Sequence, residues 1–411
     1  MIPLTGGTRR MPALDGLRIL DMTQYEAGTA CTQALAWLGA DVVKVEQPGT
    51  GDPGRGVWGD DSSDAEYFMV WNSNKRSIAM NLRKPEGRDL LLKMLPHYDV
   101  FIENYGPGVI ERLNLGYDVM KEIHPEIIYA RIKGFGLSGP WADYKCYDMI
   151  GQAAASAFSI TGEPDGPPMR PGPTTGDAGT GVQMALAISA AYVQKLKTGK
   201  GQFIELSMQE AMTYYLRTAT ASTNYGEQPT PRTGNGKLPT MSLYPCTGGG
   251  PNDYVFLMAV TPRMWQDLCR AIEREELIED PRFAHQSDRL KNSDALRQEI
   301  QAWTMQRDKY EAMRILAEAG VPASAVLDTK DLYDNPHLVE RGFIHTVEHE
   351  VHGPIKLLGW PARMSESEVP ITAAPRLGRH SSEVIAQDLS LAPADIEGLI
   401  DAGVISQADS I

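Results

Sequence analysis

Short apolar runs alternate with amphipathic stretches through the first half of the chain. Residues 17–22 (LRILDM) and 41–46 (DVVKVE) have the composition of buried strands, and residues 30–40 (ACTQALAWLGA) have a helical pattern that a glycine ends. Strand, helix and strand in this order form a βαβ unit, which implies a parallel pair. The first half therefore predicts a Rossmann-like α/β domain. The same alternation recurs, with helical patterns over 87–95 and 109–123 and strand patterns over 99–104 and 127–135.

The second half of the chain begins with a helical pattern over 182–196 and a strand pattern within 198–208. Residues 218–245 are rich in Thr, Asn, Gly and Pro, which predicts a linker or loop. A strand over 253–260 and a helix over 264–276 then begin a smaller α/β unit. We expect further helices over 294–306, 309–319 and 393–405, and extended structure over 321–343. These patterns divide the chain into a large domain over 1–217, a linker over 218–245, a small domain over 246–330 and a C-terminal part over 331–411.

Composition and charge exclude several classes of protein. The chain has 411 residues and a formal net charge of -14, which argues against broad contact with nucleic acid or an anionic membrane. The longest apolar run, 184–193, is too short to span a bilayer, and the N-terminus has no secretory pattern. Widely spaced cysteines without a C-x-x-C pair predict no zinc site and no disulfide framework, so a reducing cytoplasm is expected. The cysteines are Cys31, Cys146, Cys246 and Cys269.

The stretch GPTTGDAGTG, residues 172–181, places Asp177 among glycines and threonines just before an apolar helical pattern. One interpretation is a helix N-cap, where Asp is favoured because it accepts a backbone N–H. The other is a nucleophilic carboxylate, which a helix N-terminus would keep ionised and which glycines would let a bulky substrate approach. Both interpretations stay open on the residues alone.

Several loops have chemistry worth noting. Gly248–Gly250 forms a glycine triplet that predicts a flexible surface loop or a mobile flap with N–H donors. Residues 103–112 (ENYGPGVIER) and 72–87 (NSNKRSIAMNLRKPEG) are polar stretches that could hold an anionic cofactor or be solvated. Neither G-x-G-x-x-G nor a P-loop motif occurs, so nucleotide binding of those types is unsupported. A histidine cluster at 345, 349 and 352 lacks metal-ligand spacing, and no metal site is predicted.

Taken together, these stretches resemble family III CoA-transferases over nearly the whole chain. The resemblance implies a large Rossmann-like domain built from the N- and C-terminal parts, a smaller α/β domain, and an interlocked dimer or a heteromer with a homologous subunit. It implies no permanently bound cofactor, because coenzyme A and acyl-CoA are substrates. The motifs that carry it are residues 14–55, 72–82, 103–108, 133–140 (KGFGLSGP), 147–162 (YDMIGQAAASAFSITG), 176–181 (GDAGTG) and 198–211 (TGKGQFIELSMQEA).

The resemblance also implies roles for individual residues. Asp177 would be the nucleophile, forming an aspartyl anhydride and then an aspartyl-CoA thioester, and Gly248–Gly250 would be the flap, with Gly248 and Gly249 taking part in catalysis. Glu26 and Tyr147 would also act in catalysis. The CoA-binding residues would be Tyr25, Glu26, Ala27, Met80, Asn81, Leu82, Arg83, Asn104, Tyr105, Gly106, Arg112, Lys145, Cys146 and Tyr147.

Two departures from the family pattern bear on the activity. Many transferases of this family carry Gln where this chain has Glu26, whose carboxylate could act as an acid or base or repel an acidic substrate. Tyr147 stands where the family's racemases place a catalytic His, which argues against α-proton exchange. Succinyl-CoA as donor and an aromatic or dicarboxylic acceptor such as benzylsuccinate are expected from the resemblance. A 2-methylacyl-CoA racemase or epimerase, a non-catalytic subunit of a heteromeric transferase, and a CoA-binding protein without turnover remain the alternatives.

Overall fold

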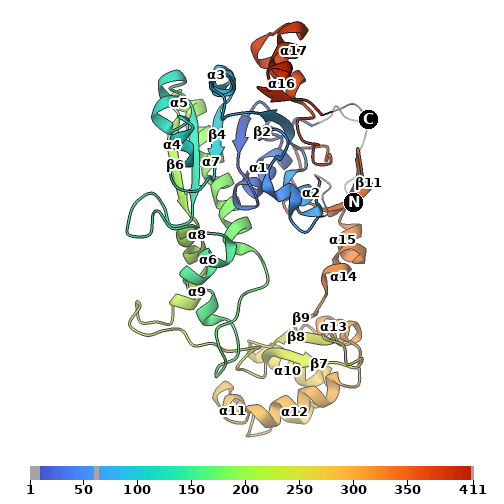
Figure 1. The fold of residues 1–411 in the computed structure, drawn as a ribbon. Helices are drawn as coiled ribbons and strands as arrows, with labels where there is room; N and C mark the ends of the chain where they lie inside the picture. Colours follow the sequence, from blue (N-terminus) through green and yellow to red (C-terminus); the bar gives the residue numbers. More distant parts are fainter. Residues whose placement is uncertain (1–9, 60–63, 409–411) are drawn as a thin grey trace. The chain divides into compact units, whose positions relative to one another are not determined.

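A computed structural model describes residues 10–59 and 64–408 (Figure 1). Contacts within the chain divide it into two compact units, which we describe separately. The large unit comprises the described residues up to Ala157, Arg170–Ser222 and the described residues from Arg341 onward. The small unit comprises Phe158–Met169 and Thr223–Glu340.

The centre of the large unit is a seven-stranded sheet with the order β12-β3-β2-β1-β4-β5-β6. Neighbouring strands are parallel, except that β12 runs antiparallel to β3. The predicted Rossmann-like domain is therefore confirmed. The strands are β1 (Arg18–Met22), β2 (Asp41–Glu46), β3 (Arg76–Met80), β4 (Val100–Glu103), β5 (Ile128–Lys133), β6 (Gln202–Ser207) and β12 (Ile405–Ser406).

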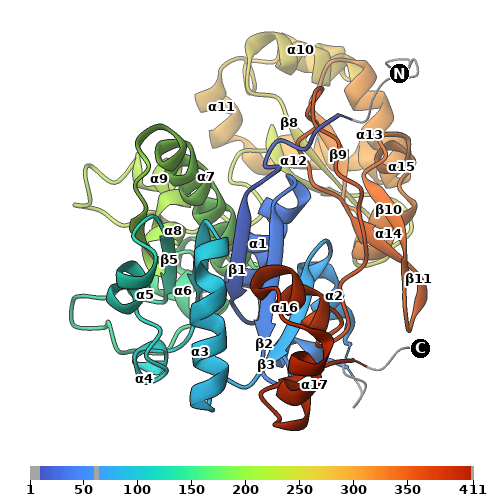
Figure 2. The same cartoon turned by 90° about the horizontal axis from the view of Figure 1, so that it is seen from above.

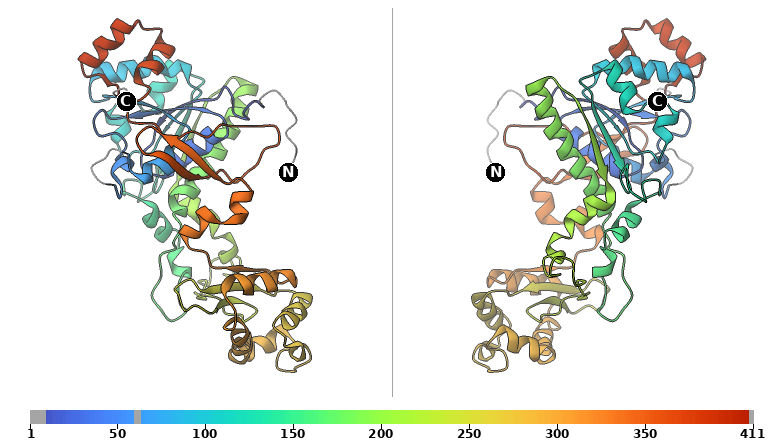
Figure 3. Two further views of the ribbon diagram at one scale, coloured as in Figure 1. Left: turned by 90° about the vertical axis from the view of Figure 1, so that its right-hand side faces the viewer. Right: turned by 90° about the vertical axis from the view of Figure 1, so that its left-hand side faces the viewer.

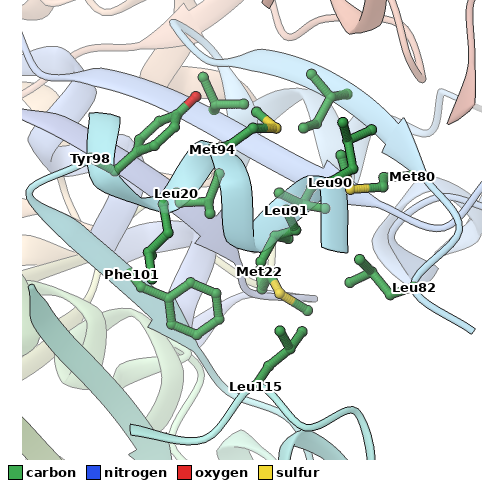
Figure 4. Close-up of a cluster of buried hydrophobic side chains, with 14 of the residues drawn as sticks. Leu20, Met22, Met80, Leu82, Leu90, Leu91, Met94, Tyr98, Phe101 and Leu115 are labelled. Carbon is green, nitrogen blue, oxygen red and sulfur yellow. The ribbon is translucent and has the colours of Figure 1, made fainter. Parts of the chain in front are cut away.

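Helices cover both faces of this sheet because successive strand residues point to opposite sides. Leu20 and Met22 of β1 join a core with α3 and α16 on one face, and Ile19 joins a second core with α1 and α7 on the other. Figure 2 shows α3 and α16 over the sheet, and Figure 4 shows the side chains of the first core. The helices are α1 (Ala27–Trp37), α2 (Glu66–Asn72), α3 (Pro85–Met94), α4 (Val109–Arg112), α5 (Tyr117–Ile123), α6 (Asp148–Ala154), α7 (Thr180–Thr198), α8 (Met208–Tyr215), α9 (Arg217–Thr220), α16 (Ser381–Leu389) and α17 (Pro393–Asp401).

The C-terminal segment returns to the N-terminal part of the large unit, and both views of Figure 3 show α16 and α17 beside α3. Arg18 of β1 donates to the Asp388 carboxylate of α16 at 2.8 Å, and the Tyr98 hydroxyl donates to its other oxygen at 2.8 Å. Residues some 290 or more apart in sequence are thus joined by buried polar contacts. A hairpin of β10 (Ile344–His349) and β11 (Gly353–Leu358) precedes this segment.

The small unit is a three-stranded antiparallel sheet, in the order β7-β8-β9, with helices packed on it. Residues 158–169 belong to this unit, although the sequence analysis placed them in the large domain. The Arg232 guanidinium holds them there by donating to the carbonyls of Ser159, Glu163 and Gly166 at 3.1, 3.2 and 2.7 Å. The elements are β7 (Met241–Pro245), β8 (Tyr254–Met258), α10 (Pro262–Ala271), α11 (Gln286–Lys291), α12 (Ser293–Thr304), α13 (Lys309–Glu318), β9 (Ala323–Ala325), α14 (Thr329–Asp334) and α15 (Pro336–Glu340).

Three expectations about local structure were wrong. The polar stretch 72–87 contains the buried strand β3. Arg76, the first residue of β3, pairs with Asp41, and Lys75 just before it pairs with Asp21, so both charges are neutralised. The predicted linker 218–245 is mostly loop, but its last residues, Met241–Pro245, form β7, which pairs with β8. The stretch 321–343 is extended only at β9 and then forms α14 and α15. A capping box between Asp328 and Asp331 stabilises the N-terminus of α14.

The buried Arg55 guanidinium is central to the stability of the large unit. It donates to both oxygens of Glu46 at 2.7 Å each and to Asp64 at 2.6 Å. Arg55→Met leaves these carboxylates without their cation, so we expect the free energy of unfolding to fall by about 3–5 kcal/mol in a denaturant titration. Arg379→Met, at a surface pair with Glu350, is the matched control and should cost less than about 1 kcal/mol. Equal losses in the two variants would contradict this role for Arg55.

Candidate active site

The strand order places a crevice beside β1. In an open α/β sheet, ligands bind at the carboxyl ends of the strands where the strand order reverses, which here lies between β1 and β4. A cavity of about 240 Å³ opens at this point. This volume suits a small ligand or one end of a larger ligand. The cavity is lined by Gln24, Tyr25, Glu26, Ala27, Asn104, Tyr105, Gly106, Pro107, Ile132, Lys133, Gly134, Ala142, Tyr144, Lys145, Cys146, Tyr147, Asp177 and Met208.

The loop from β1 to α1 is fixed by hydrogen bonds to its backbone. The Asn104 amide accepts from the Gln24 N–H at 2.8 Å and donates to the Gln24 carbonyl at 2.9 Å. Tyr25 has a φ of 59°, a left-handed conformation that is uncommon for a residue with a side chain, and its N–H donates to Asp52 at 3.0 Å. Glu26 follows directly and precedes the first residue of α1. The loop therefore presents Glu26 to the cavity in one defined conformation.

Two fully buried lysines lie beneath this loop. The Lys44 ammonium pairs with Asp52 at 2.8 Å and donates to the Thr23 carbonyl at 2.7 Å. Lys75 lies 3.3 Å from the Asp21 carboxylate and donates to the Thr29 carbonyl at 3.1 Å. Burial lowers the pKa of Lys75 to about 8, in opposition to the stabilising charge of Asp21. Both lysines are thus used to hold carbonyls of the loop and of α1 in place.

Asp177 lies on the wall of the cavity in a π-helical turn, Thr175–Gly179, that precedes α7. Gly179 is the residue that caps α7, and no side chain caps that end, so the predicted N-cap role of Asp177 is wrong. Its N–H donates to the Asp148 carboxylate at 3.1 Å. A Cβ on Gly176 would meet the Asp148 carbonyl at 2.5 Å, so glycine is required there. The glycines around Asp177 thus serve close packing of this turn.

Two further carboxyl groups lie near Asp177: that of Glu26 in the cavity wall and that of Asp148 beside the Asp177 backbone. Glu26 is only 4% exposed; one carboxylate oxygen accepts from the Thr174 hydroxyl and the other from the Tyr67 hydroxyl at 3.4 Å. Asp148 accepts from the Gln152 amide at 3.0 and 2.8 Å. No lysine or arginine forms an ion pair with Glu26, Asp148 or Asp177 in the described part of the chain.

These neighbours change the protonation of Asp177. Burial raises its pKa to about 8, and the negative charges of Glu26 and Asp148 add to the rise. Burial likewise raises the pKa of Glu26 to about 7, with Thr174 opposing and Asp148 adding. The expectation that a helix N-terminus keeps Asp177 ionised was therefore wrong. Burial and like charges outweigh the helix dipole, since none of the three carboxyl groups has a cation beside it.

The structure brings most of the predicted CoA-binding residues to this cavity. The T-shaped pair of Tyr25 and Tyr147, with ring centroids 5.8 Å apart, lines it together with seven others from the predicted set. Met80 and Leu82 instead lie in the hydrophobic core, where Figure 4 labels both. Asn81, Arg83 and Arg112 are also not among the lining residues. The seven that line the cavity are Glu26, Ala27, Asn104, Tyr105, Gly106, Lys145 and Cys146.

The glycine triplet belongs to the small unit, at the turn between β7 and β8. Gly248 and Gly249 have φ values of 115° and 73°, and a Cβ on Gly248 would meet the Asp253 carboxylate at 2.3 Å. The Gly250 N–H donates to that carboxylate at 2.8 Å. This turn therefore requires glycine for its own conformation, and its role as a flap stays a prediction.

Four residues at the site were not found from the sequence. Tyr67 and Thr174 contact Glu26, Asp148 contacts the backbone of Asp177, and Gln152 donates to Asp148. Tyr67, Thr174 and Asp148 lie 29 to 148 residues along the chain from the groups that they contact. Gln152 lies four residues from Asp148, in the same short helix α6. The one available signal was the carboxylate of Asp148 and the amide of Gln152 at i and i+4, which share a helix face.

Comparison with known proteins agrees with this geometry. A family model described as CoA-transferase family III matches residues 14–381. A formyl-CoA:oxalate CoA-transferase of Streptomyces coelicolor is 38% identical, over 96% of this chain and 99% of the relative. One from Rhodopseudomonas palustris is 36% identical, over 96% and 97%.

Solved structures show the same fold. A CaiB/BaiF family protein from Brucella suis has a TM-score of 0.82 and 30% identity, covering 92% of this chain and 100% of its own. The chain thus belongs to CoA-transferase family III, and it is a CoA-transferase. None of the helices in the described residues is long and apolar enough to cross a membrane.

The raised pKa of Asp177 predicts a stabilising substitution at the site. Between the ordinary carboxyl value near 4 and the folded value of about 8, the folded chain holds a proton that the unfolded chain releases, so stability falls as pH rises. Asp177→Asn removes that loss. In thermal melts at pH 5, 6, 7 and 8, we expect the variant to melt above the wild type by a margin that widens with pH. A constant margin across these values would contradict the raised pKa.

Proposed function

We propose that Asp177 is the nucleophile of an acyl-CoA:carboxylate CoA transfer. Its carboxylate attacks the donor thioester carbonyl, the C–S bond breaks, and CoA thiolate leaves a mixed anhydride. The thiolate then attacks the aspartyl carbonyl, releasing the donor acid and leaving an aspartyl-CoA thioester. The acceptor carboxylate attacks this thioester to form a new anhydride, and the thiolate takes the acceptor acyl group, which frees Asp177.

The observation that supports this proposal is the position of Asp177 in the cavity wall. It is 9% exposed, faces the space that β1 and β4 open, and has no cation to hold it as a structural ion pair. A buried carboxyl group with a raised pKa in a cavity is typical of a reacting group. Its burial would also keep water from the anhydride.

Two observations suggest candidates for the donor and acceptor acids. The names of the relatives suggest formyl-CoA and oxalate as the first pair to assay. The sequence resemblance suggests succinyl-CoA with an aromatic succinate such as benzylsuccinate. We further propose that Lys145 and the Asn104–Gly106 loop contact the CoA chain where it enters the cavity, since both line it.

Of the three alternatives, the racemase and the non-catalytic subunit are the two that a specific observation tests, and both are less well supported. A racemase would need a base for the α-proton, and no histidine is among the residues that line the cavity. A heteromeric transferase with this chain as a non-catalytic subunit would have no need of Asp177. Exchange of an acyl-CoA α-proton with solvent deuterium would favour the racemase, and activity only with an added homologous chain would favour the heteromer.

We also propose that the chain forms a dimer through α7. Val182, Leu186, Val193 and Leu196 lie on one face of this helix and are 47 to 71% exposed. Apolar residues at this spacing form a stripe that is typical of a protein contact.

Labelling of Asp177 tests the mechanism. After incubation with formyl-CoA, acetyl-CoA or succinyl-CoA, hydroxylamine trapping and peptide mass spectrometry should map a hydroxamate to Asp177, and Asp177→Ala should carry none. Because the attacking form is the carboxylate, the labelling rate should rise with pH and reach half its maximum near pH 8. Equal labelling of Asp177→Ala would overturn the assignment.

The α7 stripe predicts the effect of a charge at its centre. The wild-type chain of 45.1 kDa should scatter light as a dimer, and Leu186→Asp should shift it toward the monomer because burying an unpaired carboxylate is costly. Ile123→Asp, at an exposed apolar residue of α5, is the control and should leave the dimer intact. A dimer unaffected by Leu186→Asp would place the contact elsewhere.

A further inference from the structure

Glu26 is the group in the cavity that the proposed chemistry leaves unused. It lines the cavity with Asp177, and its burial is nearly complete. Both of its oxygens accept hydrogen bonds from neutral hydroxyl groups, those of Thr174 and Tyr67. These bonds hold the carboxylate in place without neutralising it.

The other charges near Asp177 do not compensate for Glu26. Asp148 is acidic as well, and it acts on both Asp177 and Glu26. Lys133 also lines the cavity, but it is used elsewhere: its ammonium lies 3.1 Å from the Glu103 carboxylate and donates to the Tyr105 carbonyl at 2.5 Å. Lys145 is exposed and does not act on the pKa of Asp177. The reacting end of the cavity is therefore negative once these carboxyl groups are ionised, above the raised pKa values of Glu26 and Asp177.

An acceptor acid must bring one carboxylate to this end. The reaction requires that carboxylate, and its negative charge is lost when it is converted into a thioester. A second anionic group on the adjacent carbon, as in oxalate, would be held next to Glu26 at the same time. Like charges at short range in a water-poor site are strongly unfavourable. A second carboxylate further along the acceptor can turn away from Glu26.

We infer that Glu26 is a specificity-determining residue that disfavours acceptors with an anionic group next to the reacting carboxylate and selects acceptors with a neutral neighbouring carbon. This inference rests on the proposed function, because it assumes that the acceptor reacts at Asp177. It gives this chain a different acceptor class from the oxalate in the names of its relatives, although the reaction type is the same.

Isosteric acceptors test the inference directly. Oxalate and oxamate have nearly the same shape, but oxamate replaces one carboxylate with a neutral amide. Enzyme labelled by acetyl-CoA at pH 8.5, where Glu26 is ionised, would be mixed with each acceptor. The rates of discharge would then be compared for the wild type, Glu26→Gln and the control Glu122→Gln, an exposed residue of α5.

We expect wild type and Glu122→Gln to favour oxamate over oxalate by tenfold or more, and Glu26→Gln to reduce that ratio by about tenfold. If neither acceptor discharges the enzyme, the preference is instead measured as inhibition. The ratio is then that of the oxalate and oxamate concentrations that each halve the rate at which acetyl-CoA labels Asp177. A wild-type preference for oxalate, or a ratio unchanged in Glu26→Gln, would overturn the inference. Absence of any label on Asp177 would instead contradict the proposed function.

Discussion

The pair of buried lysines beneath the loop from β1 to α1 is the constraint on which the site depends. Lys44 binds Asp52, and Asp52 holds the N–H of Tyr25 in a left-handed conformation. Lys75 pairs with Asp21 and holds α1 through the Thr29 carbonyl. Burying such charges is costly unless every partner is in place, and a loop tied to them cannot relax independently. The conformation of Tyr25 and Glu26 is thus set by charges that lie below the cavity.

The buried lysines of the large unit are paired with carboxylates, whereas the carboxyl groups at the cavity are not paired with cations. Lys44 and Lys75 are buried and paired with Asp52 and Asp21. Glu26 and Asp177 line the cavity, Asp148 lies beside the backbone of Asp177, and none of these three carboxyl groups forms an ion pair within the described residues. Burial raises the pKa of Asp177 to about 8, and the charges of Glu26 and Asp148 add to the rise, so this carboxyl group favours its protonated form at neutral pH. Clustered, buried carboxyl groups lower the free energy of unfolding relative to neutral side chains of the same shape. Such destabilisation is typical of sites where a carboxylate reacts.

Packing around Asp177 explains why the turn is rich in glycine. Gly176 lies against the Asp148 backbone, and Gly181 lies so close to α1 that a Cβ would meet the Ala27 carbonyl at 2.5 Å. Helices α1 and α7 therefore approach each other at the point where each begins. Glu26 immediately precedes α1, and Asp177 lies in the turn that precedes α7. The close packing of these two helix starts therefore also sets how near the two carboxyl groups lie to each other.

The sequence by itself determined the strand and helix alternation around β1, β2, β4 and β5, the family, and Asp177 as the candidate nucleophile, because local periodicity and contiguous motifs carry these features. It did not determine β3, whose flanking charges hide a buried strand until Asp21 and Asp41 neutralise them. It also gave Asp177 the wrong charge state. The pKa of that carboxyl depends on Glu26 and Asp148, which lie 151 and 29 residues away in the chain and are placed beside it by the sheet and the helix packing. Burial and long-range electrostatics are properties of the tertiary structure, and they decided the chemistry of the site.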